Sequence, residues 1–348
     1  MIDVNLILDT LLRVLGNENI ENKILSLKCL SSFATKLGSS SPESFFAIFE
    51  VMIGELGLMH ADQDIAATSI VSIKVFVQVL GPRVIPCIAK FMPRILDYCE
   101  NGSAISASLN IVLNGVSALA TFVDQIPKFI SSYLPRMIIL LIKPSNDFNG
   151  SVEHRSNILD LLNSIGMKID HHVLFPIIKK ISLVAISQGQ ESLIAILSLF
   201  NVLINNTPSS EMLQTRNEWM SLFLDILEYR TKMFSVKAED CDLIEAQIIE
   251  TFKLYTMKMN EKVFKPVFSK FLEWGLAKNA IIDKQIFLFR LVNALLDTLK
   301  SIFVPYVASV MDAVIRGMVS PSSNMVWELS MSIFKKTCQY DNSGTLFF

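Results

Sequence analysis

Two groups of histidines with neighbouring acids could do chemistry in this chain, and the first is Asp170-His171-His172. Imidazole and carboxylate groups are ligands for transition metals. Helical metal sites use residues four apart, whereas adjacent helical residues point about 100° apart. We therefore expect a solvated helix start here and no metal site. The second group lacks a third type of convergent ligand, so we expect a polar loop at His60, Asp62 and Asp64.

Nucleophilic and cofactor-binding motifs give no support for catalysis. The sequence contains no Gly-x-Ser-x-Gly elbow, phosphate loop or dinucleotide fingerprint. Disulfide frameworks and zinc modules need clustered cysteines, whereas the cysteines of this chain are scattered without any Cys-x-x-Cys spacing. We expect these cysteines to be small buried apolar residues of a protein in a reducing compartment. We therefore expect no enzyme and no cofactor. The five cysteines are Cys29, Cys87, Cys99, Cys241 and Cys338.

Lysines form the remaining candidate site, for RNA or an acidic partner. The net charge of the chain is −2, which excludes a globally basic nucleic-acid binder. Charge is uneven, however: residues 201–250 hold 4 basic and 9 acidic residues, and residues 251–300 hold 9 and 4. Phosphate contacts need lysines on one face, but Met259-Asn260-Glu261 predicts a helix start that interrupts this face. The alternative is an ordinary solvated face balanced by its acidic neighbour. The candidates are Lys258, Lys262, Lys265 and Lys270.

The overall composition is that of a folded chain. Apolar residues make up 51% and charged residues 18%, which excludes intrinsic disorder. The mean hydropathy of +0.45 is high, so a membrane span has to be considered. A span needs roughly 18 consecutive apolar residues, and the longest uncharged run, residues 101–123, is broken by Asn, Ser and Gly. We expect helices buried on much of their surface and no membrane contact.

Apolar residues recur at helical spacing nearly everywhere, and no hairpin signal is present. Three Ser/Thr-Pro pairs predict helix starts, at Ser41-Pro42, Thr207-Pro208 and Ser320-Pro321. These features predict an all-α protein. One apolar stripe is Ile105, Leu109, Val112, Val116, Leu119 and Val123, and another is Ile244, Ile248, Phe252, Tyr255 and Met259.

Internal repeats indicate how the helices are organised. Residues 84–96 resemble residues 126–138, with Pro93 and Pro135 42 residues apart. Further copies place Pro176 41 residues later, and Pro305 39 residues after Pro266. A period of about 40 to 47 residues is typical of HEAT and armadillo repeats. We therefore predict an α-solenoid of HEAT-like helical hairpins, bent by prolines inside helices.

The expected domains follow from the strength of these repeats. Residues 1–205 are predicted to be HEAT-like repeats. Residues 206–348 are predicted to be a C-terminal helical repeat region that is truncated at its end, because the tail Thr345-Leu346-Phe347-Phe348 makes a poor polar cap.

Residues 219–317 resemble the C-terminal region of the large HEAT-repeat proteins associated with the U-three small nucleolar RNA. The specific part is the run at residues 255–274. There the family has the pattern Met-Lys-Leu-Ser-Glu-x-x-Phe-Arg-Pro-Leu-Phe-x-Lys-Leu-x-x-Trp. Residues 80–96 and 126–141 are similar in kind to that family's repeats. The matching residues are Met257, Lys258, Glu261, Phe264, Pro266, Phe268, Lys270 and Trp274, and Met259, Lys265 and Leu272 are close substitutions or shifts.

This resemblance implies a non-enzymatic scaffold of the small-subunit processome. The family acts in the nucleolus, in ribosomal DNA transcription and early pre-18S rRNA processing. Its implied partners are other proteins of the early-binding subcomplex, with pre-rRNA and small nucleolar RNA as indirect contacts. No small-molecule substrate and no catalytic residue are implied.

The chain departs from the family in two respects. The family's proteins are several times longer, so this sequence resembles a C-terminal portion. The final helices expected after residue 320 look short or absent. The alternative is another HEAT-repeat scaffold such as a nuclear transport receptor. Receptors of that class usually show strongly acidic inner surfaces, and the net charge of −2 argues weakly against one.

Overall fold

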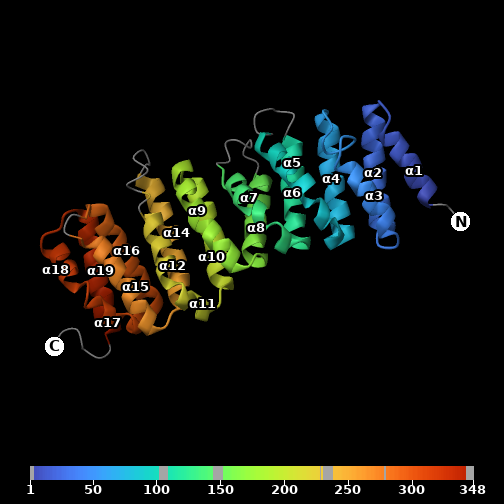
Figure 1. Ribbon diagram of the computed structural model, residues 1–348. Coiled ribbons are helices and arrows are strands. Elements are labelled where there is room, and N and C mark those ends of the chain that lie inside the picture. Colours follow the sequence, from blue (N-terminus) through green and yellow to red (C-terminus); the bar gives the residue numbers. More distant parts are fainter. Residues whose placement is uncertain are drawn as a thin grey trace. The chain divides into compact units, whose positions relative to one another are not determined.

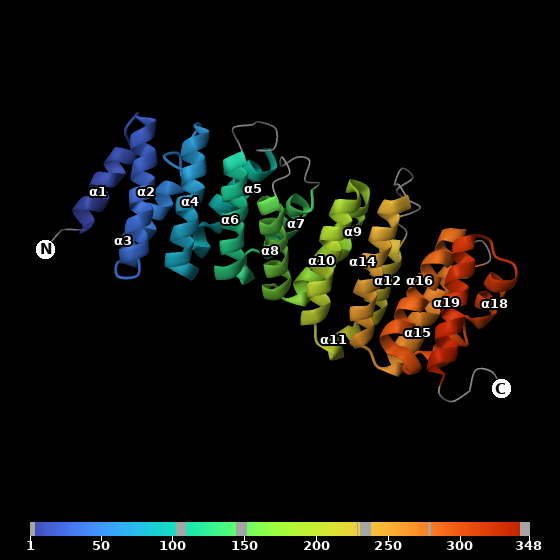
Figure 2. The same ribbon diagram turned by 180° about the vertical axis from the view of Figure 1, so that it is seen from behind.

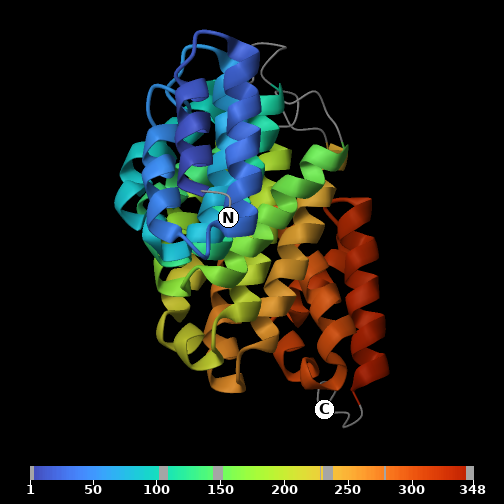
Figure 3. The same cartoon turned by 90° about the vertical axis from the view of Figure 1, so that its right-hand side faces the viewer.

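The structure is a computed structural model that describes residues 4–101, 109–143, 152–227, 229, 238–277 and 280–341. These residues are helical over most of their length and contain no strand (Figure 3). The predicted all-α class with a HEAT-like solenoid arrangement is confirmed. The chain divides into two compact units, Met1–Asn206 and Thr207–Phe348, and each is described separately below.

The first unit consists of helical hairpins that follow one another along the chain (Figure 1). Its helices are α1 (Val4–Leu15), α2 (Ile20–Leu37), α3 (Pro42–Met52), α4 (Gln63–Leu80), η1 (Gly81–Cys87), α5 (Ile88–Asn101), α6 (Leu109–Gln125), η4 (Pro127–Phe129), η5 (Ser131–Tyr133), α7 (Leu134–Leu141), α8 (Val152–Lys168), α9 (His171–Gln188) and α10 (Gln190–Asn206).

Helices of the first unit pack in two rows. In one row α2, α4, α6, α8 and α10 each contact the next, and in the other α5, α7 and α9 do so. Each hairpin joins the rows, as α5 with α6 and α9 with α10. A single hairpin cannot bury its apolar face alone, so stacking of neighbours builds the core.

The second unit repeats this arrangement with shorter helices near its end (Figure 2). Here α14 packs on α16 and α16 on α19, while α12 packs on α15 and α15 on α16. Its helices are α11 (Ser209–Gln214), α12 (Arg216–Leu227), α14 (Ala238–Met257), α15 (Glu261–Gly275), α16 (Ile282–Leu299), η7 (Lys300–Ile302), α17 (Val304–Val307), α18 (Met311–Val319) and α19 (Asn324–Tyr340).

The apolar stripes seen in the sequence form the core of these rows. Ile105 and the side chain of Leu109 lie outside the described residues, and Met259 is only half-buried. Fully burying one such side chain stabilises the fold by about 1.5–3 kcal/mol. The buried members are Val112, Val116, Leu119, Val123, Ile244, Ile248, Phe252 and Tyr255.

The repeated prolines occupy two kinds of position. Pro93, Pro176 and Pro266 lie inside α5, α9 and α15. Pro135 and Pro305 instead stand in the first turn of α7 and α17, each directly after a 3₁₀ turn. A proline in the first turn costs no hydrogen bond, because that N–H has no partner within the helix. The prediction of prolines inside helices is therefore correct for three of these five positions.

Of the three predicted helix starts, one is correct. Ser41 and Pro42 begin α3 as expected. The start predicted at Thr207-Pro208 is displaced by one residue, since Pro208 rather than Thr207 is the N-cap of α11. The start predicted at Ser320-Pro321 is wrong, because Ser320 is the C-cap of α18.

A further correction concerns the end of the chain. We expected the final helices after residue 320 to be short or absent, yet α19 runs for 17 residues. Its start is fixed by Ser323, whose side chain accepts a hydrogen bond from the Val326 N–H. Buried Val326 and Ile333 face the rest of the unit, so packing rather than the Ser-Pro signal places this helix.

Ion pairs, called polar ties below, join neighbouring repeats within each unit. The Arg136 guanidinium on α7 donates to Glu100 on α5 at 2.7 Å, and Lys168 on α8 contacts Asp124 on α6 at 2.6 Å. In the second unit Lys336 on α19 contacts Asp297 on α16 at 2.8 Å. The partners are 36 to 44 residues apart, close to the repeat length read from the sequence.

One stretch among the described residues, Gln63–Glu100, is long and apolar enough to span a membrane. It comprises α4, η1 and α5, and half of its most apolar window is buried in the protein. Both α2 and α6 pack against α4. A core helix of a solenoid meets the same criterion, because it is apolar on more than one face.

Candidate functional site

The candidate lysines lie around the junction of α14 and α15 in the second unit. Lys258 follows α14 in a turn, and α15 then begins at Glu261. The Asn260 side chain caps α15 by accepting a hydrogen bond from the Val263 N–H at 3.2 Å. The predicted helix start is thus confirmed, and Lys258 is not on the same helix as the other three lysines.

The four ammonium groups differ in how available they are. Lys258 is half-buried, and its Nζ donates to the Thr207 carbonyl at 3.4 Å. Lys270 is exposed, and its Nζ lies 3.5 Å from Asn217 Oδ1 on α12. Lys262 and Lys265 are exposed, and their ammonium groups make no ion pair or hydrogen bond with any described residue. Being three apart on one helix, these two are neighbours on its surface.

Acidic residues share the solvent face of α15. Glu261 and Glu273 are exposed beside the three lysines of the helix, so its exposed charge is mixed. Part of the charge segregation in the sequence is neutralised internally. Arg290, from the basic segment, contacts Asp242 and Glu245, from the acidic one. The lysine surface is therefore smaller than the net charge of residues 251–300 suggests.

Aromatic side chains pack between α14, α15 and their neighbouring helices, beneath the exposed lysines. Phe264 of α15 packs edge-on against Tyr306, with ring centroids 4.8 Å apart. Burial, and then the negative charge of Glu261, raise the pKa of the Tyr306 phenol. On α14, Tyr255 stacks on Trp219 at 5.6 Å, and burial raises the pKa of the Tyr255 phenol. Both phenols are neutral at physiological pH, so the lysines carry the charge here.

The group of His60, Asp62 and Asp64 forms a helix cap. His60 Nε2 lies 3.2 Å from Lys23 Nζ, and His60 Nδ1 accepts a hydrogen bond from the Asp62 N–H. The Asp62 carboxylate accepts from the backbone N–H groups of Asp64 and Ile65 at the start of α4. These contacts account for the group as local structure at a helix start.

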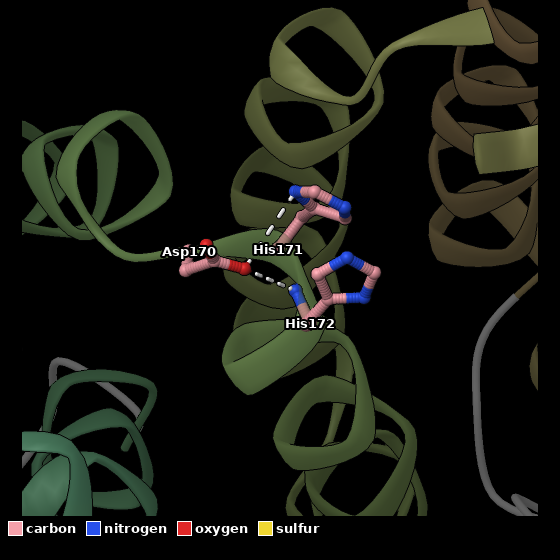
Figure 4. A group of neighbouring side chains, drawn as sticks. All are labelled: Asp170, His171 and His172. Carbon is pink, nitrogen blue, oxygen red and sulfur yellow. Dashed lines mark hydrogen bonds and ion pairs between the residues drawn. The ribbon is translucent and has the colours of Figure 1, made fainter. Parts of the chain in front are cut away.

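The group of Asp170, His171 and His172 stands at the start of α9, where Asp170 is the N-cap. The helix start expected here is present, but the two imidazole rings do not point apart. Their centroids are 4.1 Å apart (Figure 4). Side chains in a first turn have no preceding turn against which to pack, so their rotamers are less restricted. Spacing along the sequence alone could not give this result.

Two of the four described cysteines are buried, so the expectation of buried cysteines is correct for Cys87 and Cys99 but wrong for exposed Cys338. Cys99 is fully enclosed, and burial raises the pKa of its thiol to about 12. Cys87 is buried, Cys29 half-buried and Cys338 exposed. Cys241 lies outside the residues whose side chains are described. A thiol with a raised pKa is a poor nucleophile, because the thiolate is the reactive form.

Comparison with solved structures gives weak similarity. A chain from a structure of Kap95p with RanGDP is 13% identical with a TM-score of 0.48, covering 96% of this chain and 40% of that one. A structure of importin beta gives 13% identity and a TM-score of 0.45, covering 95% of this chain and 42% of that one. Similarity at this level says nothing about function.

Comparison with curated proteins gives long matches. The chain is 26% identical over 325 residues to the Schizosaccharomyces pombe U3 small nucleolar RNA-associated protein 10, covering 92% of this chain and 19% of that protein. It is 23% identical to the Dictyostelium discoideum HEAT repeat-containing protein 1 homolog (92% and 17%), and 21% identical to human HEAT repeat-containing protein 1 (82% and 14%). The chain therefore spans about a fifth or less of the length of these relatives.

A family match covers most of the second unit. Residues 211–346 match the BP28CT (NUC211) domain. This range includes all four candidate lysines, three of them on α15, and the run at residues 255–274. The resemblance found in the sequence is confirmed: residues 211–346 match the BP28CT (NUC211) domain, and about nine-tenths of the chain is similar to proteins named U3 small nucleolar RNA-associated protein 10 and HEAT repeat-containing protein 1.

Proposed function

We propose that this chain is a non-enzymatic scaffold of the small-subunit processome that acts in ribosomal DNA transcription and early pre-18S rRNA processing. The observation that carries the proposal is the match of 92% of the chain to U3 small nucleolar RNA-associated protein 10. That relative's name places it with a small nucleolar RNA, and a second set of relatives is named for HEAT repeats. The proposed site of action of this chain is the nucleolus.

Such a scaffold would act by presenting extended surfaces to which other proteins bind. Stacked hairpins expose long helix faces and rows of interhelical turns, which several proteins can contact at once. Proteins of an early-binding processome subcomplex are the proposed partners, with pre-rRNA and small nucleolar RNA held indirectly. The free lysines of α15 are the proposed contact for RNA or an acidic partner, since compact ammonium groups bind phosphate and carboxylate groups.

The two regions predicted from the sequence have different proposed roles. Residues 1–205 would supply HEAT-like repeats, and residues 206–348 the family-specific region. The BP28CT match falls wholly within the second part, which supports this division.

Depletion of the protein in its own organism tests the proposal. We expect precursors that retain the 5′ external transcribed region to accumulate, and 18S rRNA to fall relative to large-subunit rRNA, on northern blots. Expression of the complete gene from a second locus should restore both. Unchanged early precursors after verified depletion would refute the proposed role.

A further inference from the structure

The start of α9 gathers three side chains that can donate to a metal ion. Asp170, His171 and His172 each place one ligand atom within 4.8 Å of those of the other two (Figure 4). His171 Nδ1 lies 3.8 Å from Asp170 Oδ1, and the two imidazole rings have centroids 4.1 Å apart at an interplanar angle of 40°. We propose that these three residues bind one divalent transition-metal ion of the zinc class.

The donor distances are within side-chain reach of those that a metal needs. With metal–ligand bonds of about 2.0–2.2 Å, neighbouring donors stand roughly 3.0–3.5 Å apart. The three ligand atoms lie within 4.8 Å of one another, so rotation of exposed His172 and half-buried His171 about their side-chain bonds has to close a gap of at most about 1.3–1.8 Å. The carboxylate is already held, because Asp170 Oδ1 accepts a hydrogen bond from the His172 N–H at 2.8 Å. Asp170 Oδ2 remains for a metal.

The surroundings leave room for further ligands. A groove of about 640 Å³ within the first unit contains all three residues. Its walls come from the segment after α6, the α8–α9 turn and the end of α10, and they include Lys128, Ser131, Lys168, Leu203 and Asn206. Two or three water molecules, or one side chain of a partner, fit there to complete a tetrahedral or octahedral shell.

The ligand types, together with the lack of a strongly negative surrounding, select the class of metal. The N-terminus of α9 carries a partial positive charge, and Lys128 lines the same groove. Lys168 is neutralised by Asp124 at 2.6 Å. A hard cation held by charge attraction alone, such as Mg²⁺ or Ca²⁺, is disfavoured in this setting and prefers oxygen ligands. Two imidazoles and one carboxylate instead suit Zn²⁺, Ni²⁺ or Cu²⁺, which form strong bonds to nitrogen.

Isothermal titration of the chelator-treated chain with ZnCl₂ tests this site. We expect one ion per chain for the unmodified protein, and at least a tenfold loss of affinity for His171→Ala/His172→Ala. His60→Ala serves as the matched control, because His60 is also a part-buried histidine at a helix start and should leave binding unchanged. Titration with MgCl₂ should give no binding.

A conservative variant separates ligation from folding. Asp170→Asn keeps a good N-cap but removes the carboxylate. We expect it to weaken Zn²⁺ binding about tenfold while the urea unfolding midpoint stays within error. Absence of Zn²⁺ binding to the unmodified chain, or equal affinity in the double histidine variant, would overturn the proposal. Equal loss in His60→Ala would also overturn it, because the binding would then not be specific to the start of α9.

Discussion

Lys262 and Lys265 of α15 are the candidate residues whose charge is most available to a partner. Both are exposed, and their ammonium groups make no ion pair or hydrogen bond with the residues that the structure describes, whereas the ammonium groups of Lys258 and Lys270 have contacts within the second unit. We predict that Lys262→Glu/Lys265→Glu weakens binding of single-stranded RNA about tenfold and lowers the salt dependence by about two ion equivalents. Fluorescence anisotropy at several salt concentrations measures both.

The matched control for this prediction is Lys28→Glu/Lys36→Glu on α2. These lysines are also exposed, lie outside the BP28CT match, and give the same change in net charge. Equal loss of affinity in both double variants would show that only net charge matters and that α15 is no specific contact.

Arg290 holds a buried carboxylate in the second unit. Its guanidinium contacts Glu245, which is 1% exposed, and Asp242. We predict that Arg290→Met destabilises the chain by about 3 kcal/mol, because a buried carboxylate loses its cation. Lys336→Met should cost only about 0–1 kcal/mol, since its partner Asp297 is 56% exposed. Urea unfolding checks both, and equal effects would contradict this ranking.

Single-residue contacts were the least predictable part of the molecule. The sequence shows a basic segment beside an acidic one, but the pairing of Arg290 with Glu245 depends on how α14 and α16 pack 45 residues apart. The same holds for the His171 and His172 rings, whose approach is set by rotamers in a first turn. Periodicity fixes the face of a helix, not the contacts that this face makes.

At the scale of elements, close approach of neighbouring helices is the feature most open to test. A Cβ at Gly166 on α8 would lie 2.7 Å from Val202 Cγ1 and 2.8 Å from Val202 Cβ on α10. Val202 is β-branched and rigid, so α8 and α10 have to separate. We predict that Gly166→Ala destabilises the chain by about 1–2 kcal/mol, because the clash outweighs the gain in helix propensity.

Gly16→Ala is the control for this prediction. A Cβ at exposed Gly16 meets only backbone oxygens at 3.4 Å or more, so the free energy of unfolding should change by no more than about 0.5 kcal/mol. Equal stability of Gly166→Ala and the unmodified chain would contradict the close packing of α8 on α10.

Elements were more predictable than contacts, and the failures have physical causes. The stripe from Ile244 to Tyr255 is buried as expected, because apolar side chains at a period of 3.6 residues share one helix face, which is stable only when it is shielded from water. The helix start assigned to Ser320-Pro321 was wrong, since Ser323 supplies the cap instead. Capping chemistry is local and several serines compete for it, so the signal places a start only to within a few residues.

At the scale of the whole molecule, repetition made the fold predictable. Prolines 41 or 42 residues apart indicated hairpin repeats, and polar ties 36 to 44 residues apart connect those repeats in the structure. A solenoid needs only nearest-neighbour contacts, so a repeat seen in the sequence implies most of its packing. The candidate site is different: the run at residues 255–274 pointed to relatives, and only the structure shows which of its lysines are free.

Affinity purification of the tagged protein from its own organism tests the central claim most directly. The eluate would be analysed by northern blot for U3 small nucleolar RNA and by mass spectrometry for protein partners, with an untagged strain as control. Association with the small-subunit processome predicts enrichment of U3 RNA together with other processome proteins. An eluate without U3 RNA that contains a small transport GTPase and its cargoes would contradict the claim and favour a transport receptor.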